Sequence, residues 1–418
     1  MCLRKTGLPI APGGEVDRNK EICIAAGFTS NTDRNSRTEA PPNPVTWKSA
    51  MKKLYPVLAS VLLLVIFSPD LHAEEDRLKH PLYFPPAHGT WETVRPAQVG
   101  WDQAKLHEAL DYAKENHSTG VVILHKGRIL AEQYFEIEGA RSAKFRKRIL
   151  GRDEAGHTIE DVASAQKSVA SILLGIAQQK GLLEIDDRVN QYLGAGWSRA
   201  TPQQEKAITV RHLITMTSGL TNRGTFEVSP GTKWRYNTTA YAKSMDVVAA
   251  AANMDRHELT RQWLTQPIGM SHSKWVKRGS PEMQLVNGFG FATTARDLAR
   301  FGLMTMAGGK WGDKTILADQ EYLKAATTSS QELNPFYGYL WWVNRDANAP
   351  NRAPRLATAP KDMFSANGAL NRRCFVVPSL QLVVTRLGDQ PGGNRTFDRR
   401  FWKLLVEAMP RNVKTEIP

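Results

Sequence analysis

The most informative stretch of this chain is VASAQKSVASILL, residues 162–174. Ser164 and Lys167 stand three positions apart, just before an apolar run that predicts a helix. Their side chains should therefore share one helix face, one turn apart. An amine in that position can accept the proton of a serine hydroxyl and make the serine a nucleophile without any histidine. Ser164 is thus the candidate nucleophile and Lys167 its candidate base.

The Ser-x-x-Lys spacing alone carries little weight, because it occurs three times in this sequence. The occurrences are Ser49–Lys52, Ser164–Lys167 and Ser271–Lys274. The first lies ahead of a targeting segment, and no apolar helical pattern follows the third. Only Ser164 opens a long apolar helix, which we expect to end at Gly181.

Residues 51–73 have the pattern of a secretory signal peptide. Basic residues at 52–53 precede an apolar run over 54–67, and Ala73 offers a small residue for cleavage. The run is shorter than the roughly 20 residues of a membrane span, although an uncleaved anchor is the alternative. We expect a periplasmic or secreted protein without a stable membrane span after cleavage. Residues 1–50 would be a disordered leader or a mis-assigned start, with translation beginning at Met51.

The remainder, residues 74–418, is long enough for one compact two-lobed domain. The chain has 55 Lys and Arg against 41 Asp and Glu, but no nucleic-acid reader motif accompanies this basic charge. Cys374 is the only cysteine after residue 73 and is expected to be a small core residue. The sequence lacks a His-Glu-x-x-His metal motif and a Gly-x-Ser-x-Gly elbow, which disfavours metallohydrolases and α/β-hydrolases.

The distribution of apolar patterns predicts an α+β fold. Residues 120–124 and 129–135 read as a β-hairpin, and strands return at 339–343, 374–377 and 380–387. Between them, the segment of about 186–308 is mostly helical, with helices expected at 210–216, at 240–252 and from 293 onward. Thr294 is the expected N-cap of the third of these. A last helix is expected over 396–409. Strands at both ends with helices between them predict an antiparallel sheet and a mainly helical lobe.

Several further stretches accompany Ser164–Lys167 in a fixed order. They are RHLITMTSGL (211–220), PGTKWRYNT (230–238), PIGM (267–270), TTARDLARF (293–301) and YGYLWW (337–342). With these, the chain resembles the serine β-lactamase-related hydrolases: class C β-lactamases, penicillin-binding D,D-peptidases, certain esterases and 6-aminohexanoate-dimer hydrolases. The resemblance implies a β-lactamase/D,D-peptidase-like fold and hydrolysis of a small-molecule ester or amide, without metal or cofactor.

The second motif of the family, Tyr-x-Asn, corresponds to residues 236–238. The resemblance assigns Tyr236 as a proton relay, with a pKa lowered by the neighbouring lysine ammonium. Threonine replaces the motif asparagine, which in relatives contacts the substrate amide. Asn237 and Thr238 are therefore both candidate substrate-binding residues.

The third motif, Lys-Thr-Gly or His-x-Gly, corresponds to residues 366–368. Alanine stands at its cationic position, so the group that in relatives helps to hold a substrate carboxylate is missing. Asn367, Gly368 and Ala369 are candidate substrate-binding residues, with Gly368 allowing substrate close to the strand. The backbone N–H groups of Ser164 and Ala369 would form the oxyanion hole.

These residues leave three functions open. An exported esterase or amidase acting through a Ser164 acyl-enzyme fits them best. A β-lactamase or D,D-peptidase acting on penicillins or peptidoglycan stems is disfavoured by Ala366. A non-catalytic binding descendant of the fold is the third, because two of the three motifs are altered. The sequence gives no indication of the oligomeric state.

Overall fold

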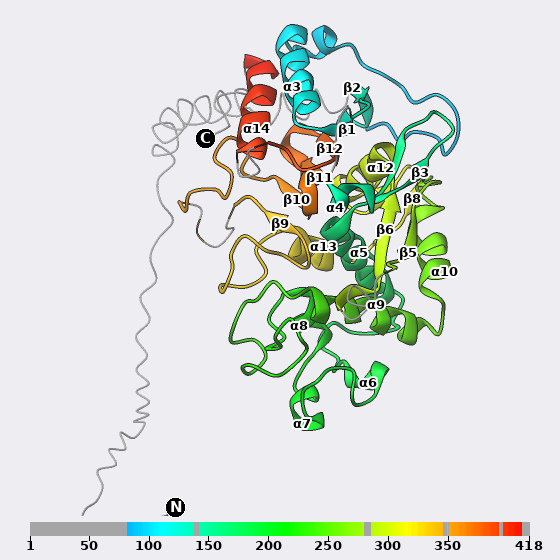
Figure 1. Ribbon diagram of the computed structural model, residues 1–418, viewed down its shortest axis with the longest axis vertical. Helices are drawn as coiled ribbons and strands as arrows, with labels where there is room; N and C mark the ends of the chain where they lie inside the picture. The colour runs from blue at the N-terminus through cyan, green and yellow to red at the C-terminus, as the bar shows by residue number, and fades with distance from the viewer. Residues whose placement is uncertain are drawn as a thin grey trace, which may run out of the picture. The chain divides into compact units, whose positions relative to one another are not determined.

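The main sheet of the protein joins strands from both ends of the chain. The computed structural model describes residues 82–137, 142–279, 286–345, 349, 351–392 and 396–411. Six antiparallel strands follow the order β2-β1-β12-β11-β10-β9. Their bounds are Ser118–His125 (β1), Arg128–Tyr134 (β2), Trp342–Val343 (β9), Phe364–Gly368 (β10), Arg372–Val377 (β11) and Leu382–Gly388 (β12). Because β1 pairs directly with β12, the first and the last strand of the fold lie next to each other in the middle of this sheet (Figure 1).

The predicted hairpin is confirmed, and its turn has a local cause. Lys126 and Gly127 connect β1 to β2 with φ values of 50° and 82°. Two successive left-handed residues are typical of the tight turns that match the twist of antiparallel strands. A Cβ on Gly127 would lie 1.8 Å from the carbonyl oxygen of Tyr83, so only glycine fits at this position.

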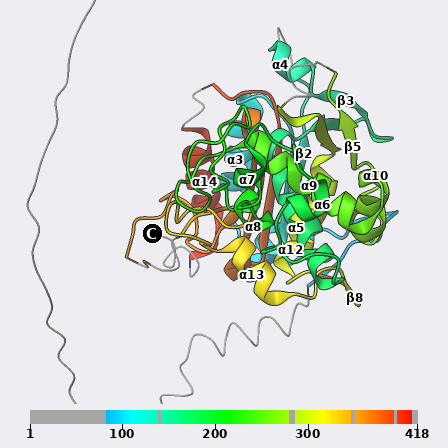
Figure 2. The same ribbon diagram turned by 90° about the horizontal axis from the view of Figure 1, so that it is seen from below.

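Helices cover both faces of the main sheet. α3 (Gln103–Glu115) and α14 (Phe397–Ala408) lie side by side over one face, while α5 (Gln166–Gln179) and α12 (Ala295–Met306) cover the other (Figures 1 and 2). Residues of β1 alternate between the two cores: Val121 and Ile123 pack with α3 and α14, and Val122 packs with α5 and α12. This alternation follows from the two-residue repeat of a strand.

A second sheet lies beside the nucleophile helix. It has the order β3-β4-β6-β5, and its strands are Ile149–Arg152 (β3), Thr158–Asp161 (β4), Phe289–Thr293 (β6) and Lys274–Lys277 (β5). β5 and β6 fall within the segment expected to be mostly helical. They escape sequence analysis because they are short and their apolar residues, such as Trp275 and Phe291, give no longer repeat.

Elsewhere that segment consists of helices joined by loops, such as the loop over 215–237. It contains α6 (Asn190–Leu193), α7 (Pro202–Glu205), α8 (Val210–Ile214), α9 (Thr238–Ala252), α10 (Arg256–Thr260) and the π-helical η4 (Arg261–Thr265). The remaining elements are η2 (Pro96–Val99), α4 (Ala143–Arg146), η3 (Ala163–Ala165), β7 (Lys310–Trp311), β8 (Lys314–Thr315), α13 (Gln320–Thr327), η5 (Ala369–Asn371) and η6 (Pro378–Leu380).

Other local predictions have mixed outcomes. Thr294 caps α12 as expected, since its hydroxyl accepts from the N–H of Asp297 at 3.2 Å. Cys374 is fully buried in β11, which confirms it as a core residue. The strand expected over 339–343 is wrong in extent: Leu340 has a φ of 62°, and the strand begins only at Trp342.

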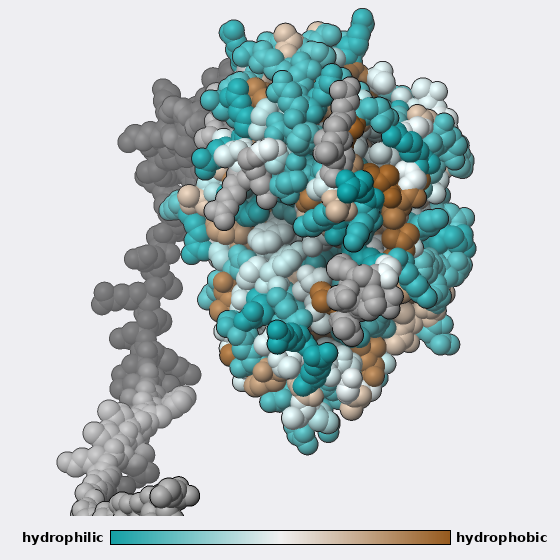
Figure 3. All heavy atoms as spheres, viewed as in Figure 1, coloured by the Kyte–Doolittle hydropathy of each residue, from teal (hydrophilic) through white to brown (hydrophobic). Residues whose placement is uncertain are grey.

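The leader and signal-peptide predictions for residues 1–73 lie outside the described residues. Among the helices that the structure describes, none is long and apolar enough to cross a membrane. The face drawn in Figure 3 is mostly hydrophilic, with hydrophobic residues in scattered groups.

Candidate active site

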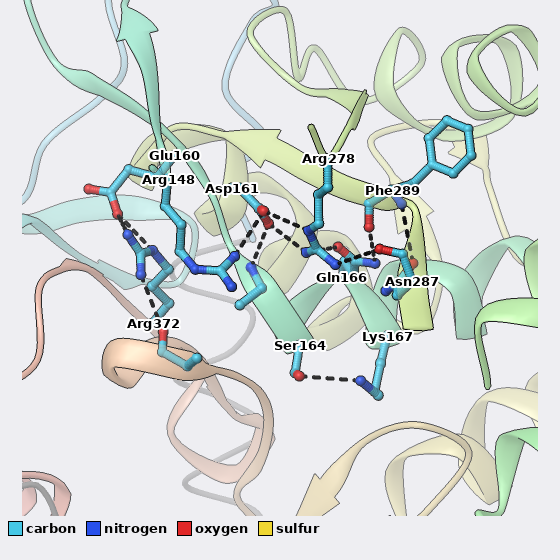
Figure 4. A network of polar contacts seen from close by, with 12 residues as sticks. Arg148, Glu160, Asp161, Ser164, Gln166, Lys167, Arg278, Asn287, Phe289 and Arg372 are labelled. Carbon is cyan, nitrogen blue, oxygen red and sulfur yellow. Dashed lines mark hydrogen bonds and ion pairs between the residues drawn. The ribbon is translucent and has the colours of Figure 1, made fainter. Parts of the chain in front are cut away.

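The structure brings Ser164 and Lys167 together. Ser164 lies in the short helix η3, and Lys167 lies in the first turn of α5, which follows directly. The Lys167 Nζ atom is 3.2 Å from the Ser164 Oγ atom (Figure 4). Ser164 is partly exposed, whereas Lys167 has only 2% of its surface exposed. The hydroxyl can thus meet a substrate while the amine stays away from bulk water.

No carboxylate lies in an ion pair with Lys167 among the described residues. Its other polar neighbour is the Thr238 Oγ1 atom at 3.4 Å. The rings of Tyr241 and Tyr236 lie 4.0 and 4.8 Å from Nζ, a contact that favours an ammonium by about 1 kcal/mol. Burial acts in the opposite direction and dominates: burial first, and then the positive charge of Arg278, hold the pKa of Lys167 well below its ordinary value. A neutral amine is the form that can accept a proton.

Tyr236 lies beside the pair, but its expected electrostatics are wrong. Burial raises the pKa of its phenol, and a hydrogen bond with Ser164 and the charge of Arg373 only partly oppose this. The expectation of a lowered pKa assumed an ammonium at Lys167. Because burial disfavours that ammonium, the phenolate lacks the stabilising charge. Tyr236 is therefore a neutral phenol, which can donate and accept a proton in one step.

A buried carboxylate fixes the turn that carries Ser164. Asp161 accepts hydrogen bonds from Arg148 at 2.8 Å, from Arg278 at 3.0 Å and from the N–H of Ala163 at 2.9 Å (Figure 4). Burial alone would raise the pKa of Asp161, but the two arginines lower it and keep it ionised. Ala163 has a φ of 53°, a conformation unfavourable for alanine that the surrounding contacts maintain.

Gln166 connects the same network to the start of α5. Its Nε2 atom donates to the Tyr241 hydroxyl at 2.5 Å and to the carbonyl of Phe289 at 3.0 Å, and its Oε1 atom accepts from Arg278 at 3.1 Å. Arg278 was not predicted as part of the site, because 112 residues separate it from Gln166 and no local motif marks it. Arg278 acts on Lys167 through its positive charge, which lowers the pKa of the amine.

The structure gives Asn237 a role other than substrate binding. Its side chain caps α9 by accepting from the N–H of Ala240 at 2.9 Å, and its amide donates to the carbonyls of Leu220 and Thr221. With 1% exposure and these internal partners, it holds the loop that presents Tyr236. The Oγ1 atom of the neighbouring Thr238 lies 3.4 Å from the Nζ atom of Lys167, and its expected contact with a substrate stays a prediction.

Gly368 makes a close approach to the chain itself, and its expected contact with a substrate stays a prediction. A Cβ at this position would lie 2.1 Å from the carbonyl oxygen of Val162, so only glycine fits here. This contact presses the end of β10 against the turn that carries Ser164. Ala369 follows at the start of η5, and η5 in turn contacts η3.

The other residues of the third motif lie as follows. Ala366 is fully buried in β10 and packs with the core on the side of α5. Asn367 is partly exposed, and its Oδ1 atom is buried without a hydrogen-bond partner among the described residues.

An aromatic wall borders the site and was not predicted as a unit. The wall comprises Trp234, Tyr236, Tyr337 and Trp342. The rings of Tyr236 and Trp342 are stacked with centroids 6.0 Å apart, and Tyr337 meets Trp342 edge-on at 4.9 Å. Stretches 230–238 and 337–342 thus meet in space beside Lys167.

Comparison with known proteins agrees with this architecture. The Beta-lactamase family model matches residues 105–408. An uncharacterised protein of Alkalihalophilus pseudofirmus is 24% identical over 319 residues, covering 69% of this chain and 90% of the relative. Among solved structures, a class C β-lactamase variant has a TM-score of 0.52 at 16% identity, over 72% of this chain and 97% of its own. The hydrolase EstCE1, described as having promiscuous acyltransferase activity, has a TM-score of 0.52 at 14% identity, over 74% of this chain and 98% of its own.

At these identities the solved structures establish the fold, while the family model covers most of the folded chain. Fold, motif order and family match agree, and we conclude that this chain is a hydrolase-fold protein that belongs to the beta-lactamase family.

Proposed function

We propose that the protein is an exported serine hydrolase that cleaves ester or amide bonds of small acyl compounds through an acyl-enzyme on Ser164. The observation that carries this proposal is the 3.2 Å contact between Ser164 Oγ and a buried Lys167 amine that lacks a carboxylate partner in the described chain. A lysine used only for structure would ordinarily remain charged and paired.

The first half of the reaction follows from these positions. Lys167 takes the hydroxyl proton as Ser164 Oγ forms a bond to the substrate carbonyl carbon. The carbonyl oxygen becomes an oxyanion, which the N–H groups of Ser164 and Ala369 would stabilise. Both residues lie in the first turn of a 3₁₀ helix, where N–H groups have no partner within the helix. One such donor contributes about 3–4 kcal/mol in comparable sites.

The second half returns the protons. The intermediate collapses when the carbon–leaving-group bond breaks and the leaving group receives a proton from Lys167 through the Tyr236 phenol. Water then enters, loses a proton through the same pair and attacks the acyl carbon. Ser164 Oγ leaves with a proton, and the acid product departs.

Export and the choice of substrate belong to the same proposal. The signal-peptide pattern of residues 51–73 supports a periplasmic or secreted location. The alanine at position 366 supports esters or amides other than penicillins, because the strand offers no cation to a substrate carboxylate there. Without that cation, the binding of a substrate carboxylate at the strand would be weaker by about 1.5–3 kcal/mol.

Covalent labelling tests the proposal. The purified protein is treated with a fluorophosphonate probe and assayed with p-nitrophenyl esters, linear amides and nitrocefin. Labelling should be complete in wild type and absent in Ser164→Ala. Ser171→Ala is the matched control, since it removes a buried hydroxyl about two helical turns further along α5 that has no hydrogen-bond partner among the described residues, and it should label normally.

Three outcomes would contradict the proposal. Equal labelling of Ser164→Ala would place the nucleophile elsewhere. No labelling and no turnover by wild type would favour a non-catalytic binding protein. Fast nitrocefin hydrolysis relative to esters would favour a β-lactamase.

A further inference from the structure

A polar cavity lies next to the proposed oxyanion hole, on the side of Ala369. It has a volume of about 450 Å³ and is lined by Gly368, Ala369, Leu370, Asn371, Lys144, Arg355, Arg373, Gln390 and Asp398. This volume is within the range of small-molecule sites. The cavity therefore adjoins Ala369, the candidate oxyanion donor, and Ser164 is not among its lining residues.

The charges that line this cavity are unbalanced. Asp398 is the only carboxylate among its lining residues, and it is already paired with Arg373, whose Nη2 and Nε atoms lie 3.0 and 3.1 Å from it. Arg373 also donates to the carbonyl of Gly368 at 3.0 Å, so its guanidinium is fixed. Arg355 and Lys144 remain, and no hydrogen bond or ion pair of their side chains is found within the described chain. Two positive charges thus face the cavity uncompensated.

The position of Arg355 leaves its donors available. Its guanidinium lies over the ring of Trp342, with Cζ 4.6 Å from the ring centroid. Such stacking uses the face of the guanidinium and leaves the N–H groups at its edge free to bind a carboxylate in two-point fashion. Trp342 in turn stacks on Tyr236. The arginine is therefore held at a fixed place relative to the proton relay.

A third donor points to the same chemistry. The Nε2 atom of Gln390 is buried and has no hydrogen-bond partner among the described residues. A buried amide donor without a partner costs about 1–3 kcal/mol unless an acceptor occupies the space beside it. With Arg355 and Lys144, it forms a set of donors that matches an anionic acceptor.

We propose that this cavity is an anion subsite: the substrate carries a carboxylate that Arg355 and Lys144 bind, with Gln390 as an additional donor. This inference rests on the proposed hydrolase function and narrows its substrate class to acidic esters or amides. The cation that is missing at position 366 of the strand is in effect replaced by residues from α4 and from the loop before β10. The carboxylate would therefore lie further from Ser164 along the chain of the substrate.

Matched substrates test the subsite. Wild type is assayed with p-nitrophenyl hemi-esters of succinate, glutarate and adipate and with neutral p-nitrophenyl esters of equal length. The carboxylate of the substrate could instead belong to the leaving group. The acetate ester of 4-hydroxybenzoate, which has an anionic leaving group, is therefore compared with the acetate ester of the neutral 4-hydroxybenzamide. At least one anionic member should exceed its neutral counterpart tenfold or more in kcat/KM, and added salt should reduce this preference.

Variants locate the effect. Arg355→Gln and Lys144→Gln should each lower kcat/KM for the preferred anionic substrate ten- to hundredfold, mainly through KM, and change the neutral ester less than twofold. Lys361→Gln, an exposed cation of the same loop outside the cavity, is the control and should have no effect. A wild type without anionic preference in any pair, or variants that lose both substrates equally, would overturn the proposal.

A binding measurement separates this inference from the catalytic one. Ser164→Ala protein should bind the preferred hemi-ester in calorimetry, and the additional Arg355→Gln change should weaken that binding tenfold or more. Binding without turnover by wild type would refute the hydrolase function and retain the subsite. Turnover of neutral esters without anion binding would retain the hydrolase function and refute the subsite.

Discussion

Replacing Gly368 by alanine tests how the end of β10 positions the candidate oxyanion hole. The added Cβ would lie 2.1 Å from the carbonyl oxygen of Val162, whereas such contacts are essentially never shorter than 3.0 Å. The strand end and the turn before Ser164 must therefore separate by about 0.9 Å. Active-site geometry is sensitive at this scale, and a misplacement of about 1 Å can reduce a rate about 100-fold. Overpacking also destabilises a fold by about 1–3 kcal/mol.

We accordingly expect Gly368→Ala to remain folded with a lower melting temperature and to lose about 100-fold in kcat/KM for a neutral p-nitrophenyl ester. Circular dichroism and steady-state kinetics measure the two effects. Gly279→Ala is the matched control, because no atom of the described residues lies within 4 Å of its added Cβ. A folded Gly368→Ala protein with activity within twofold of wild type would refute the reasoning that this contact positions Ala369.

Three further predictions concern the amine, a cap and a buried ion pair. Because Lys167 acts as a neutral amine and its pKa is lowered, kcat/KM should stay high well below pH 10 and fall when acid protonates the amine. Arg278→Gln should raise the pKa of Lys167 and move the acid limb of the pH profile to higher pH, whereas Arg278→Lys, which keeps the charge, should not. An acid limb that does not move in Arg278→Gln would contradict the effect of the Arg278 charge on Lys167. Asn237→Ala should lower the free energy of unfolding in urea by about 1–2 kcal/mol, with a smaller loss for Asn237→Asp, which keeps the capping acceptor; an unchanged midpoint would argue against the cap. Glu160→Gln should lower the free energy of unfolding by about 3–5 kcal/mol in the same assay, because it leaves the charge of the fully buried Arg372 unpaired. The Glu160→Leu/Arg372→Met double variant should recover most of that free energy. Equal losses of stability in the single and the double variant would contradict the role of the ion pair.

The parts of the fold that sequence predicted are those with strong local signals. The hairpin follows from two apolar runs around Lys126-Gly127, and α5 follows from its long apolar repeat after Ser164. Thr294 is a capping residue at a change of pattern. In each case the interactions that determine the element join residues that are close in sequence, so a short stretch of sequence is enough to predict it.

The parts that sequence missed depend on contacts between distant segments. β9 is shorter than its aromatic pattern indicates because Leu340 leaves the strand conformation to hydrogen-bond with Ile214. Arg278 enters the site from β5's end, and nothing near it in sequence marks that role. Motif position also assigned Asn237 to substrate binding, whereas its side chain caps α9 and hydrogen-bonds to the backbone of Leu220 and Thr221.

The direct pairing of β1 with β12 has a consequence for synthesis of the protein. Arg386 in β12 hydrogen-bonds with Ser118 in β1 across 268 residues of chain. The centre of the sheet cannot form until nearly the entire polypeptide has left the ribosome, and such long loop closures make folding slow. A chain that stays open until its last strands arrive remains threadable through a narrow translocation pore, which is a requirement of the export that we propose.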